Sequence, residues 1–127
     1  MIIGCRMPRG GGKIEEGAMP FAHRFIGNPI LSGIGRLLFG IQITDFHCGA
    51  RMFSKEKFVA LNCTSEGMEF ASEMIIKAHK ANLNISEIPI HLRKSGRIRA
   101  VSHLRPIPDG LRHIKAMLQL KFDDYTN

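Results

Sequence analysis

Several features are missing from this 127-residue chain, and each absence narrows the class of protein. Only three cysteines occur, Cys5, Cys48 and Cys63, an odd number without framework spacing, which argues against a disulfide scaffold and favours a reducing compartment. No uncharged apolar run approaches the roughly 18 residues that a membrane span requires. The longest apolar stretch, 29–43, is interrupted by Arg36. At 127 residues the sequence fits one domain at most, and no internal repeat is visible.

Acidic residues are also scarce relative to basic ones. The chain holds 18 lysines and arginines against 11 aspartates and glutamates, a formal net charge of +7, which predicts an anionic partner such as nucleic acid, phospholipid or a phosphorylated ligand. Nucleic acid is not expected, because Phe21, Phe25, Phe39 and Phe70 lie on apolar stripes. Stacking on bases would need these rings among the arginines.

The segment 44–53, with the sequence TDFHCGARMF, holds more chemically active groups than any other ten residues. Three interpretations remain open. It is a tight turn in which Asp45 caps the following N–H groups and pairs with Arg51 across a bend at Gly49, or a turn that faces a substrate. The third, a metal site through His47 and the next cysteine, is disfavoured because adjacent side chains of an extended chain point to opposite faces.

Helical periodicity predicts a first helix over 19–39 that ends at Gly40, and Pro29 should kink it or split it in two. Arg24 and Asn28 are four apart and share a face of this helix. An anion site there competes with the simpler interpretation of a solvated charge.

Two more helices are predicted after the central segment. Ser54 is placed to cap a helix that ends at residue 61. A regular helix over 66–80 has an apolar stripe, and its opposite side is interpreted as a solvent-exposed row of ion pairs. That row consists of Glu69, Glu73 and Lys77.

The remaining segments read as strands, loops and one basic helix. Residues 1–5 predict a buried strand, and 85–92 a strand with Pro89 at an edge or bulge. The glycine-rich loop 7–19 lacks the GK[ST] ending of a P-loop and is interpreted as flexible. A basic loop over 93–105 precedes a helix that opens at Pro108 and Asp109. Its expected apolar stripe is Leu111, Ile114, Leu118 and Phe122.

Five short motifs follow one another between about Ile2 and about Leu120. They are Gly4-Cys-Arg6, Ala18-Met-Pro-Phe-Ala-His-Arg24 with Gly27-Asn-Pro29, Asp45-Phe-His-Cys-Gly49 with Arg51, Gly67-Met-Glu-Phe-Ala-Ser-Glu73, and Ile88-Pro89 before the basic loop. In this order they resemble the second half of a family 2 glycosyltransferase, and they are most similar to the polyprenyl-phosphate group, which is typified by dolichol-phosphate mannose synthase.

The resemblance implies a GT-A fold, a single mixed α/β domain. Residues 1–127 would be its C-terminal, acceptor-side part, mostly helical with a few strands. In the family the first half binds the nucleotide, and an Asp-x-Asp motif there holds Mg²⁺ or Mn²⁺. This sequence has no Asp-x-Asp. We therefore expect the N-terminal nucleotide-binding half to be absent, no metal or cofactor in this chain, Mg²⁺ or Mn²⁺ in the intact enzyme, and no activity of the chain alone.

The chemistry implied by the resemblance is inverting transfer of a sugar from a nucleotide-sugar to a polyprenyl (dolichyl or undecaprenyl) phosphate. The phosphate oxygen is already anionic, so the reaction needs positioned cationic donors more than a base. By position, Arg6, Arg24 and Asn28 match the acceptor-phosphate contacts. Asp45 matches the acid of the Asp-x-x-(Ser/Cys)-Gly turn and is the catalytic candidate, with sugar orientation or pairing to Arg51 as its expected role and base catalysis second.

Further contacts to the sugar or diphosphate are expected from His47, Gly49, Arg51, Arg97 and Arg99. The sequence departs from the family at Cys5, where a serine is usual, and in the basic loop, where a serine between the arginines is missing.

We therefore expect the acceptor-side half of a glycosyltransferase that lies peripherally on the cytoplasmic face of a membrane. Self-association is a further expectation, because a strand at 1–5 exposes an edge. The alternatives are a small basic module for anionic membrane or nucleic acid, and a non-catalytic remnant.

Overall fold

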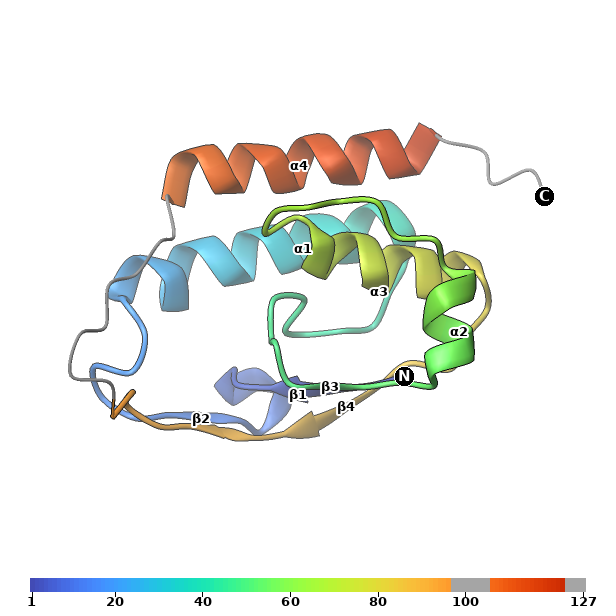
Figure 1. Ribbon diagram of the computed structural model, residues 1–127. Helices are drawn as coiled ribbons and strands as arrows, with labels where there is room; N and C mark the ends of the chain where they lie inside the picture. Colours follow the sequence, from blue (N-terminus) through green and yellow to red (C-terminus); the bar gives the residue numbers. More distant parts are fainter. Residues whose placement is uncertain (97–105, 123–127) are drawn as a thin grey trace.

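A small sheet, a pair of helices and a further helix are stacked in layers (Figure 1). The structure is a computed structural model that describes residues 1–96 and 106–122. Helices α1 (Asn28–Phe39) and α3 (Phe70–Lys80) lie above the strands, and α4 (Pro106–Phe122) packs across both of them. The chain is thus mixed α/β, with four α-helices and short strands in its described part. The GT-A assignment stays a prediction.

The main sheet is built around the strand that the sequence places at the start of the chain. Strand β1 (Ile2–Cys5) lies between β3 (Arg51–Met52), which is antiparallel to it, and β4 (Ser86–Pro89), which is parallel. Ile3 stands opposite both Arg51 and Glu87 in this register. The end of β1 therefore lies beside the central segment and the end of β4. The expectation that this strand exposes an edge is wrong, because β1 is paired on both sides.

The single strand expected over 85–92 is two strands in two sheets. Strand β4 ends at Pro89, and the N–H of Ile90 donates to the carbonyl of Cys5 at 2.9 Å. The chain then continues as β5 (His91–Leu92), which pairs in parallel with β2 (Lys13–Ile14). Proline has no N–H for a sheet ladder, so the change of sheet follows directly after it.

The prediction that Pro29 divides the first helix is confirmed. A five-residue π-helical segment, η2 (His23–Gly27), precedes α1, and Pro29 lies in the first turn of α1, where its missing N–H leaves no intrahelical bond unmade. The helix ends at Gly40, whose φ of 70° is the left-handed conformation that glycine adopts most easily. Its N–H donates to the carbonyl of Arg36.

The predicted cap of the second helix is also confirmed. The Ser54 hydroxyl accepts from the N–H of Lys57 at the start of α2 (Lys55–Ala60). Helix α3 begins at Phe70, four residues later than the pattern predicted.

The interpretation of Glu73 and Lys77 as a solvent-exposed ion pair is wrong. The two side chains pair at 2.7 Å but are 3% and 8% exposed. The segment before α3 folds over them, and the Glu73 carboxylate accepts the N–H groups of Thr64 and Ser65 at 3.0 and 2.8 Å. Burial raises the pKa of Glu73, but Lys77 and these donors outweigh it and lower the pKa to about 2.

The apolar stripe expected on the last helix is wrong as well. The buried residues of α4 are His113, Met117 and Leu120, whereas Leu111 and Phe122 are 63% and 80% exposed. This choice of face follows from the helix's two partners, α1 and α3, which local periodicity does not reveal. None of the described helices is long and apolar enough to cross a membrane.

The core links all layers through the segment that precedes β3. Phe46 is fully buried in a cluster with residues of β1, α3 and α4. Its ring lies against Gly35 of α1, where an added Cβ would approach a ring carbon to 2.5 Å. Glycine at 35 is therefore required for the central segment to lie this close to the helix.

Candidate functional site

A buried ion pair joins the end of β1 to the central segment. The Arg6 guanidinium donates from Nε to Oδ2 of Asp45 at 2.7 Å and from Nη2 to Oδ1 at 2.8 Å. The backbone N–H of Arg6 also donates to Oδ2, at 3.1 Å. Asp45 is fully buried, and the Arg6 side chain is 15% exposed. Two residues that the sequence assigns to one site thus meet across 39 positions of the chain.

The backbone around Asp45 is held by residues that the sequence analysis did not single out. Glu87 of β4 accepts the N–H groups of Thr44 and Asp45, both at 2.8 Å. Ser32 of α1 accepts the N–H of Phe46 at 3.2 Å. A charged residue inside an apolar strand pattern is a sequence signal that could have identified Glu87, whereas nothing in the sequence marks Ser32.

The expected pairing of Asp45 with Arg51 is wrong. Arg51 donates instead to three backbone carbonyls: from Nη2 to Phe46 at 2.6 Å, from Nε to Cys48 at 2.9 Å and from Nη1 to Ala71 at 2.9 Å. It therefore ties the turn to α3. Burial lowers the pKa of Arg51. Its forked guanidinium can donate hydrogen bonds to carbonyls that point in different directions.

The charges of the Arg6–Asp45 pair stabilise each other. Burial alone raises the pKa of Asp45, but the hydrogen bonds and charge of Arg6 more than offset this and lower it. Conversely, burial opposes the charged form of Arg6, and Asp45 raises its pKa overall. Asp45 is therefore an ionised carboxylate at neutral pH, and both of its oxygens are occupied.

His47 and Gly49 complete the turn. The backbone N–H of His47 donates to Oδ1 of Asp45 at 3.3 Å. Its ring points toward α3, where Nε2 lies 3.3 Å from the Ser72 hydroxyl. Burial and the neighbouring His113 lower the pKa of His47 to about 3. Gly49 is exposed, and an added Cβ there would meet no atom within 4 Å.

The glycine-rich loop is packed more closely than a flexible loop would be. Gly12 is buried, and an added Cβ would lie 2.2 Å from the carbonyl oxygen of Cys5. A Cβ at Gly10 would lie 2.4 Å from the sulfur of Cys5. The loop therefore needs glycine in order to cross the end of β1, next to Arg6.

Arg24 and Asn28 lie on η2 and at the start of α1. Arg24, Phe21 and Phe25 line an open hollow of about 460 Å³, and the Arg24 guanidinium lies 5.1 Å from the centre of the Phe25 ring. Asn28 donates weakly to the sulfur of Met19 at 3.6 Å. Across the described ranges, no hydrogen bond or ion pair joins Arg6 to Arg24 or Asn28. Arg97 and Arg99 lie outside the described residues.

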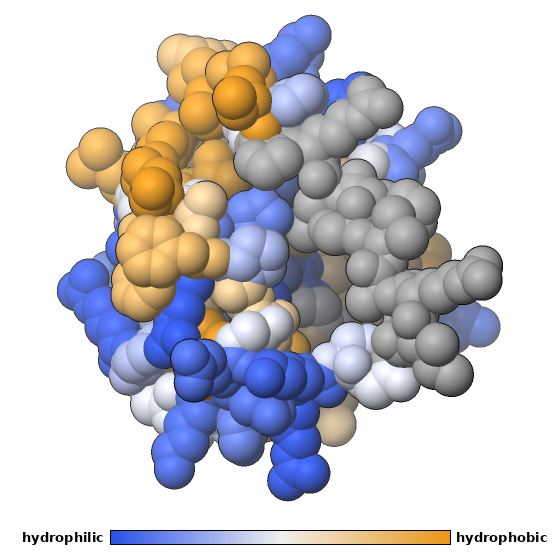
Figure 2. Space-filling model, turned by 90° about the vertical axis from the view of Figure 1, so that its left-hand side faces the viewer, coloured by the Kyte–Doolittle hydropathy of each residue, from blue (hydrophilic) through white to orange (hydrophobic). Residues whose placement is uncertain are grey.

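Hydrophobic side chains gather at the level of the helices on the face shown in Figure 2, above a hydrophilic lower edge. Phe21, Phe25, Ile26 and Ile30 are each more than half exposed, so η2 and the start of α1 present a row of uncovered apolar groups. Arg24 lies within this row.

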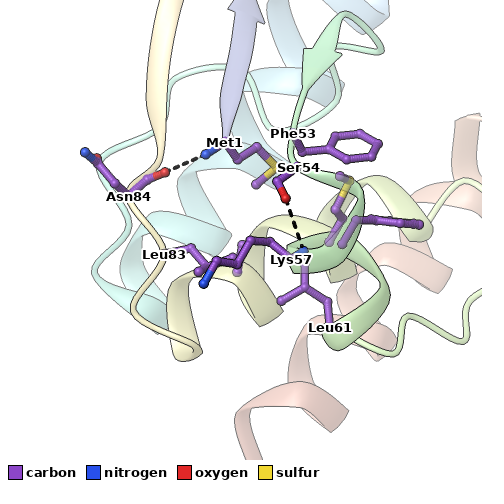
Figure 3. Close-up of a pocket in the computed structure, with 10 residues that line it drawn as sticks. Met1, Phe53, Ser54, Lys57, Leu61, Leu83 and Asn84 are labelled. Carbon is purple, nitrogen blue, oxygen red and sulfur yellow. Dashed lines mark hydrogen bonds between the residues drawn. The ribbon is translucent and has the colours of Figure 1, made fainter.

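A second hollow, of about 230 Å³, lies under α2 and apart from Asp45 (Figure 3). Phe53, Phe58 and Leu61 contribute to its largely apolar wall, and Lys57 is the charged side chain among its lining residues. The N-terminal amine donates to the carbonyl of Asn84 at its rim. The described lining of this hollow includes no acid, histidine or thiol, and we assign no chemistry to the hollow.

The described residues do not fit the divalent cation that the resemblance implies. No group of three or more His, Cys, Asp or Glu side chains within them could hold a metal ion. The carboxylate of Asp45 is occupied by Arg6, and that of Glu87 by two backbone N–H groups. We therefore assign no metal-dependent step of sugar transfer to these residues.

Comparison with curated proteins finds glycosyltransferases. The chain is 39% identical over 120 residues to the low-salt glycan biosynthesis hexosyltransferase Agl6 of Haloferax volcanii, which covers 93% of this chain and 27% of Agl6. It is 40% identical over 74 residues to a UDP-N-acetylglucosamine–dolichyl-phosphate N-acetylglucosaminyltransferase of Methanococcus voltae (57% of this chain, 29% of that protein). Glycosyltransferase AglJ of Haloferax volcanii is 29% identical over 99 residues (76% and 31%).

The chain thus spans about a third or less of the length of these three relatives. No family model matches it, and no solved structure does. The relatives give no support to the alternative of a small basic module for membrane or nucleic acid. In its motifs and in these relatives, the chain resembles the family 2 glycosyltransferases over a part of their length.

Proposed function

We propose that this chain is the acceptor-side part of a GT-A glycosyltransferase that moves a sugar from a nucleotide-sugar to a polyprenyl phosphate with inversion. The name of the Methanococcus voltae relative supports a dolichyl-phosphate acceptor. The nucleotide-binding half, with its Mg²⁺ or Mn²⁺, would be a separate part of the domain. The chain by itself is then inactive.

The observation that carries this proposal is the position of Arg24 in an exposed apolar row. A polyprenyl phosphate joins an anionic head to a long apolar chain, so its site needs a cation beside uncovered apolar surface. Arg24 supplies the cation at the edge of the 460 Å³ hollow, and Phe21 and Phe25 supply the surface. An arginine fork can hold two phosphate oxygens at once. Asn28 stands one helical turn further along and offers an amide donor.

Asp45 acts in this proposal through Arg6. With a lowered pKa and both oxygens occupied, it is a poor proton acceptor, and an anionic phosphate nucleophile needs none. Its carboxylate fixes the Arg6 guanidinium, whose Nη1 makes no hydrogen bond to the described residues. Nη1 is the donor left for a substrate oxygen, while Gly49, Arg97 and Arg99 are proposed sugar or diphosphate contacts. The His47 ring is turned toward Ser72 and its Nδ1 is buried, so we do not include it among these contacts.

The test compares two arginines of different surroundings. Arg24→Ala is expected to weaken binding of a short polyprenyl phosphate, presented in phosphatidylcholine vesicles, by about ten- to a hundredfold. A charge-assisted contact is worth roughly 1.5–3 kcal/mol, and about 1.4 kcal/mol corresponds to a factor of ten. Arg112→Ala is the matched control, because Arg112 is an exposed arginine on α4 with a 4.0 Å contact to Asp109.

Binding is measured by vesicle co-sedimentation, with and without the prenyl phosphate and at two salt concentrations. A surface-charge effect would make both variants lose affinity equally and fade together with added salt. Equal losses would leave the acceptor site without support.

A further inference from the structure

Three elements meet at one buried hydroxyl. The Oγ of Ser72, on α3, lies 3.3 Å from Nε2 of His47 in the central segment and 3.0 Å from Nδ1 of His113 on α4. The two imidazole rings stand edge to face with their centres 4.5 Å apart. Ser72 is fully buried and His113 is 3% exposed. Two acids act on His113 through their negative charge: Glu69, on the turn before Ser72, and Asp109 of α4.

The number of protons in this cluster restricts its hydrogen bonds. A serine hydroxyl donates one hydrogen bond, so Ser72 can donate to one of the two ring nitrogens and must accept from the other. A neutral imidazole carries its proton on one nitrogen only. The direction in which the Ser72 hydroxyl donates therefore decides the tautomer of both histidines.

The unpartnered nitrogen of His47 selects the direction. Nδ1 of His47 is buried and has no hydrogen-bond partner among residues 1–96 and 106–122. A proton on Nδ1 would be a buried donor with nothing to accept it, and orphaned N–H donors are rarer than under-used acceptors. The proton then belongs on Nε2, which donates to Ser72, and Ser72 donates to Nδ1 of His113 across the shorter of the two distances.

Both histidines are neutral near pH 7. Burial and the proximity of His113 lower the pKa of His47 to about 3, with Arg6 and Arg51 acting in the same direction and Asp45 against it. Burial also lowers the pKa of His113, while Glu69 and Asp109 act against it. A protonated His113 would donate from Nδ1, and the Ser72 hydroxyl would lose its acceptor.

We propose that Ser72 and His113 are positioning residues that hold His47 as its Nε2–H tautomer and thereby couple the placement of α4 to the turn that carries Asp45. The coupling reaches the carboxylate because the backbone N–H of His47 donates to Oδ1 of Asp45. Helix α4 therefore belongs to the hydrogen-bonded group that orients the Arg6–Asp45 pair. This inference stands on hydrogen-bond geometry and does not depend on the proposed sugar transfer.

The test is long-range ¹⁵N NMR of the imidazole nitrogens in the full 127-residue chain. At pH 7 the wild-type chain should show a protonated Nε2 and a bare Nδ1 at His47, and a bare Nδ1 at His113. Ser72→Ala should abolish the tautomer preference of His47 and its response to titration of His113. Ser72→Thr keeps the hydroxyl and should retain both, and Ser86→Ala, at an exposed serine on β4, should change neither.

Two results would overturn the proposal: a proton on Nδ1 of His47 in the wild-type chain, or wild-type tautomers and coupling in folded Ser72→Ala. Where Ser72→Ala does not fold, the wild-type tautomer decides alone. A purely structural role for Ser72 would lower the stability of Ser72→Ala but would leave the His47 tautomer in the folded variant the same as in the wild type.

Discussion

Asp45 shows how one side chain can be recognised correctly and its partner missed. The sequence singled out the carboxylate and paired it with Arg51, six positions away, whereas the structure pairs it with Arg6. The difference matters energetically, because a buried carboxylate with two bonds from one guanidinium leaves an unpaired buried charge when either partner is removed. Arg51, freed from that role, satisfies three carbonyls and acts as a link between the turn and α3.

We predict that Asp45→Asn lowers the free energy of unfolding by about 3 kcal/mol at pH 7, the lower end of the range for breaking a buried pair. The contribution of Asp45 is complete at that pH, since a carboxylate with a lowered pKa stabilises the fold above its unfolded pKa and loses this effect as the pH falls through the folded one. Urea denaturation measures the difference.

Arg112→Ala is the control for Asp45→Asn, because an exposed pair contributes less than about 1 kcal/mol. Adding Arg6→Met to Asp45→Asn should recover part of the loss, since it removes the stranded charge. Additive losses in the double variant would contradict a coupled pair.

At the scale of elements, the sequence predicted those features that neighbouring residues determine. The Ser54 cap, the glycine stop at residue 40 and the division of the first helix at Pro29 each depend on a few consecutive residues, and all three are confirmed. The candidate turn around Asp45 was found for the same reason. Its residue types are concentrated within ten positions.

Features set by contacts distant in sequence could not be predicted. The buried face of α4 depends on α1 and α3, and the Glu73–Lys77 pair is covered by a loop whose path the helical period does not encode. Ser32 and Glu87 hold the backbone of the turn from 14 and more than 40 positions away. A polar residue inside an otherwise apolar pattern is the signal that could have identified Glu87.

The turn and α4 share a pH dependence that follows from their histidines. His47 has a pKa of about 3 in the folded chain, against 6.5 for an unperturbed histidine. The unfolded chain therefore binds more protons as the pH falls below 6.5, so stability decreases in that direction. Between pH 6.5 and 5 we predict that His47 alone accounts for a loss of about 2 kcal/mol, at roughly 1.4 kcal/mol per pH unit.

Urea denaturation at closely spaced pH values tests this prediction. His47→Gln should reduce the slope of the curve between pH 6.5 and 5, whereas Val59→Gln, at an exposed valine on α2, should leave the slope unchanged. Carboxylate titration contributes mostly below this window, so the two effects separate. Equal slopes for His47→Gln and the wild type would contradict the buried neutral histidine.

The whole molecule combines a net charge of +7 with uncovered apolar rows on η2, the start of α1 and α4. A single exposed leucine is ordinary, but a continuous helix face that meets no other element in the described chain is typical of an interaction surface. The outer face of α4 presents Leu111 and Leu118 together with Lys115. This arrangement is consistent with the expectation of peripheral membrane binding, since basic groups attract anionic lipid and apolar groups enter the interface.

We predict that the chain binds vesicles of phosphatidylcholine and anionic phosphatidylglycerol, and that Leu111→Gln combined with Leu118→Gln weakens this binding about thirtyfold. Burying part of a leucine side chain is worth roughly 1 kcal/mol, and about 1.4 kcal/mol corresponds to a factor of ten. Val59→Gln is the matched control, because Val59 is 66% exposed but lies on α2, away from α4 (Figure 1). Flotation at low and high salt separates the contributions, since salt screens the charges and leaves apolar insertion intact. An equal loss in Val59→Gln would show that the apolar face of α4 has no special part in binding, and binding that salt abolishes completely would show that charge alone attracts the chain.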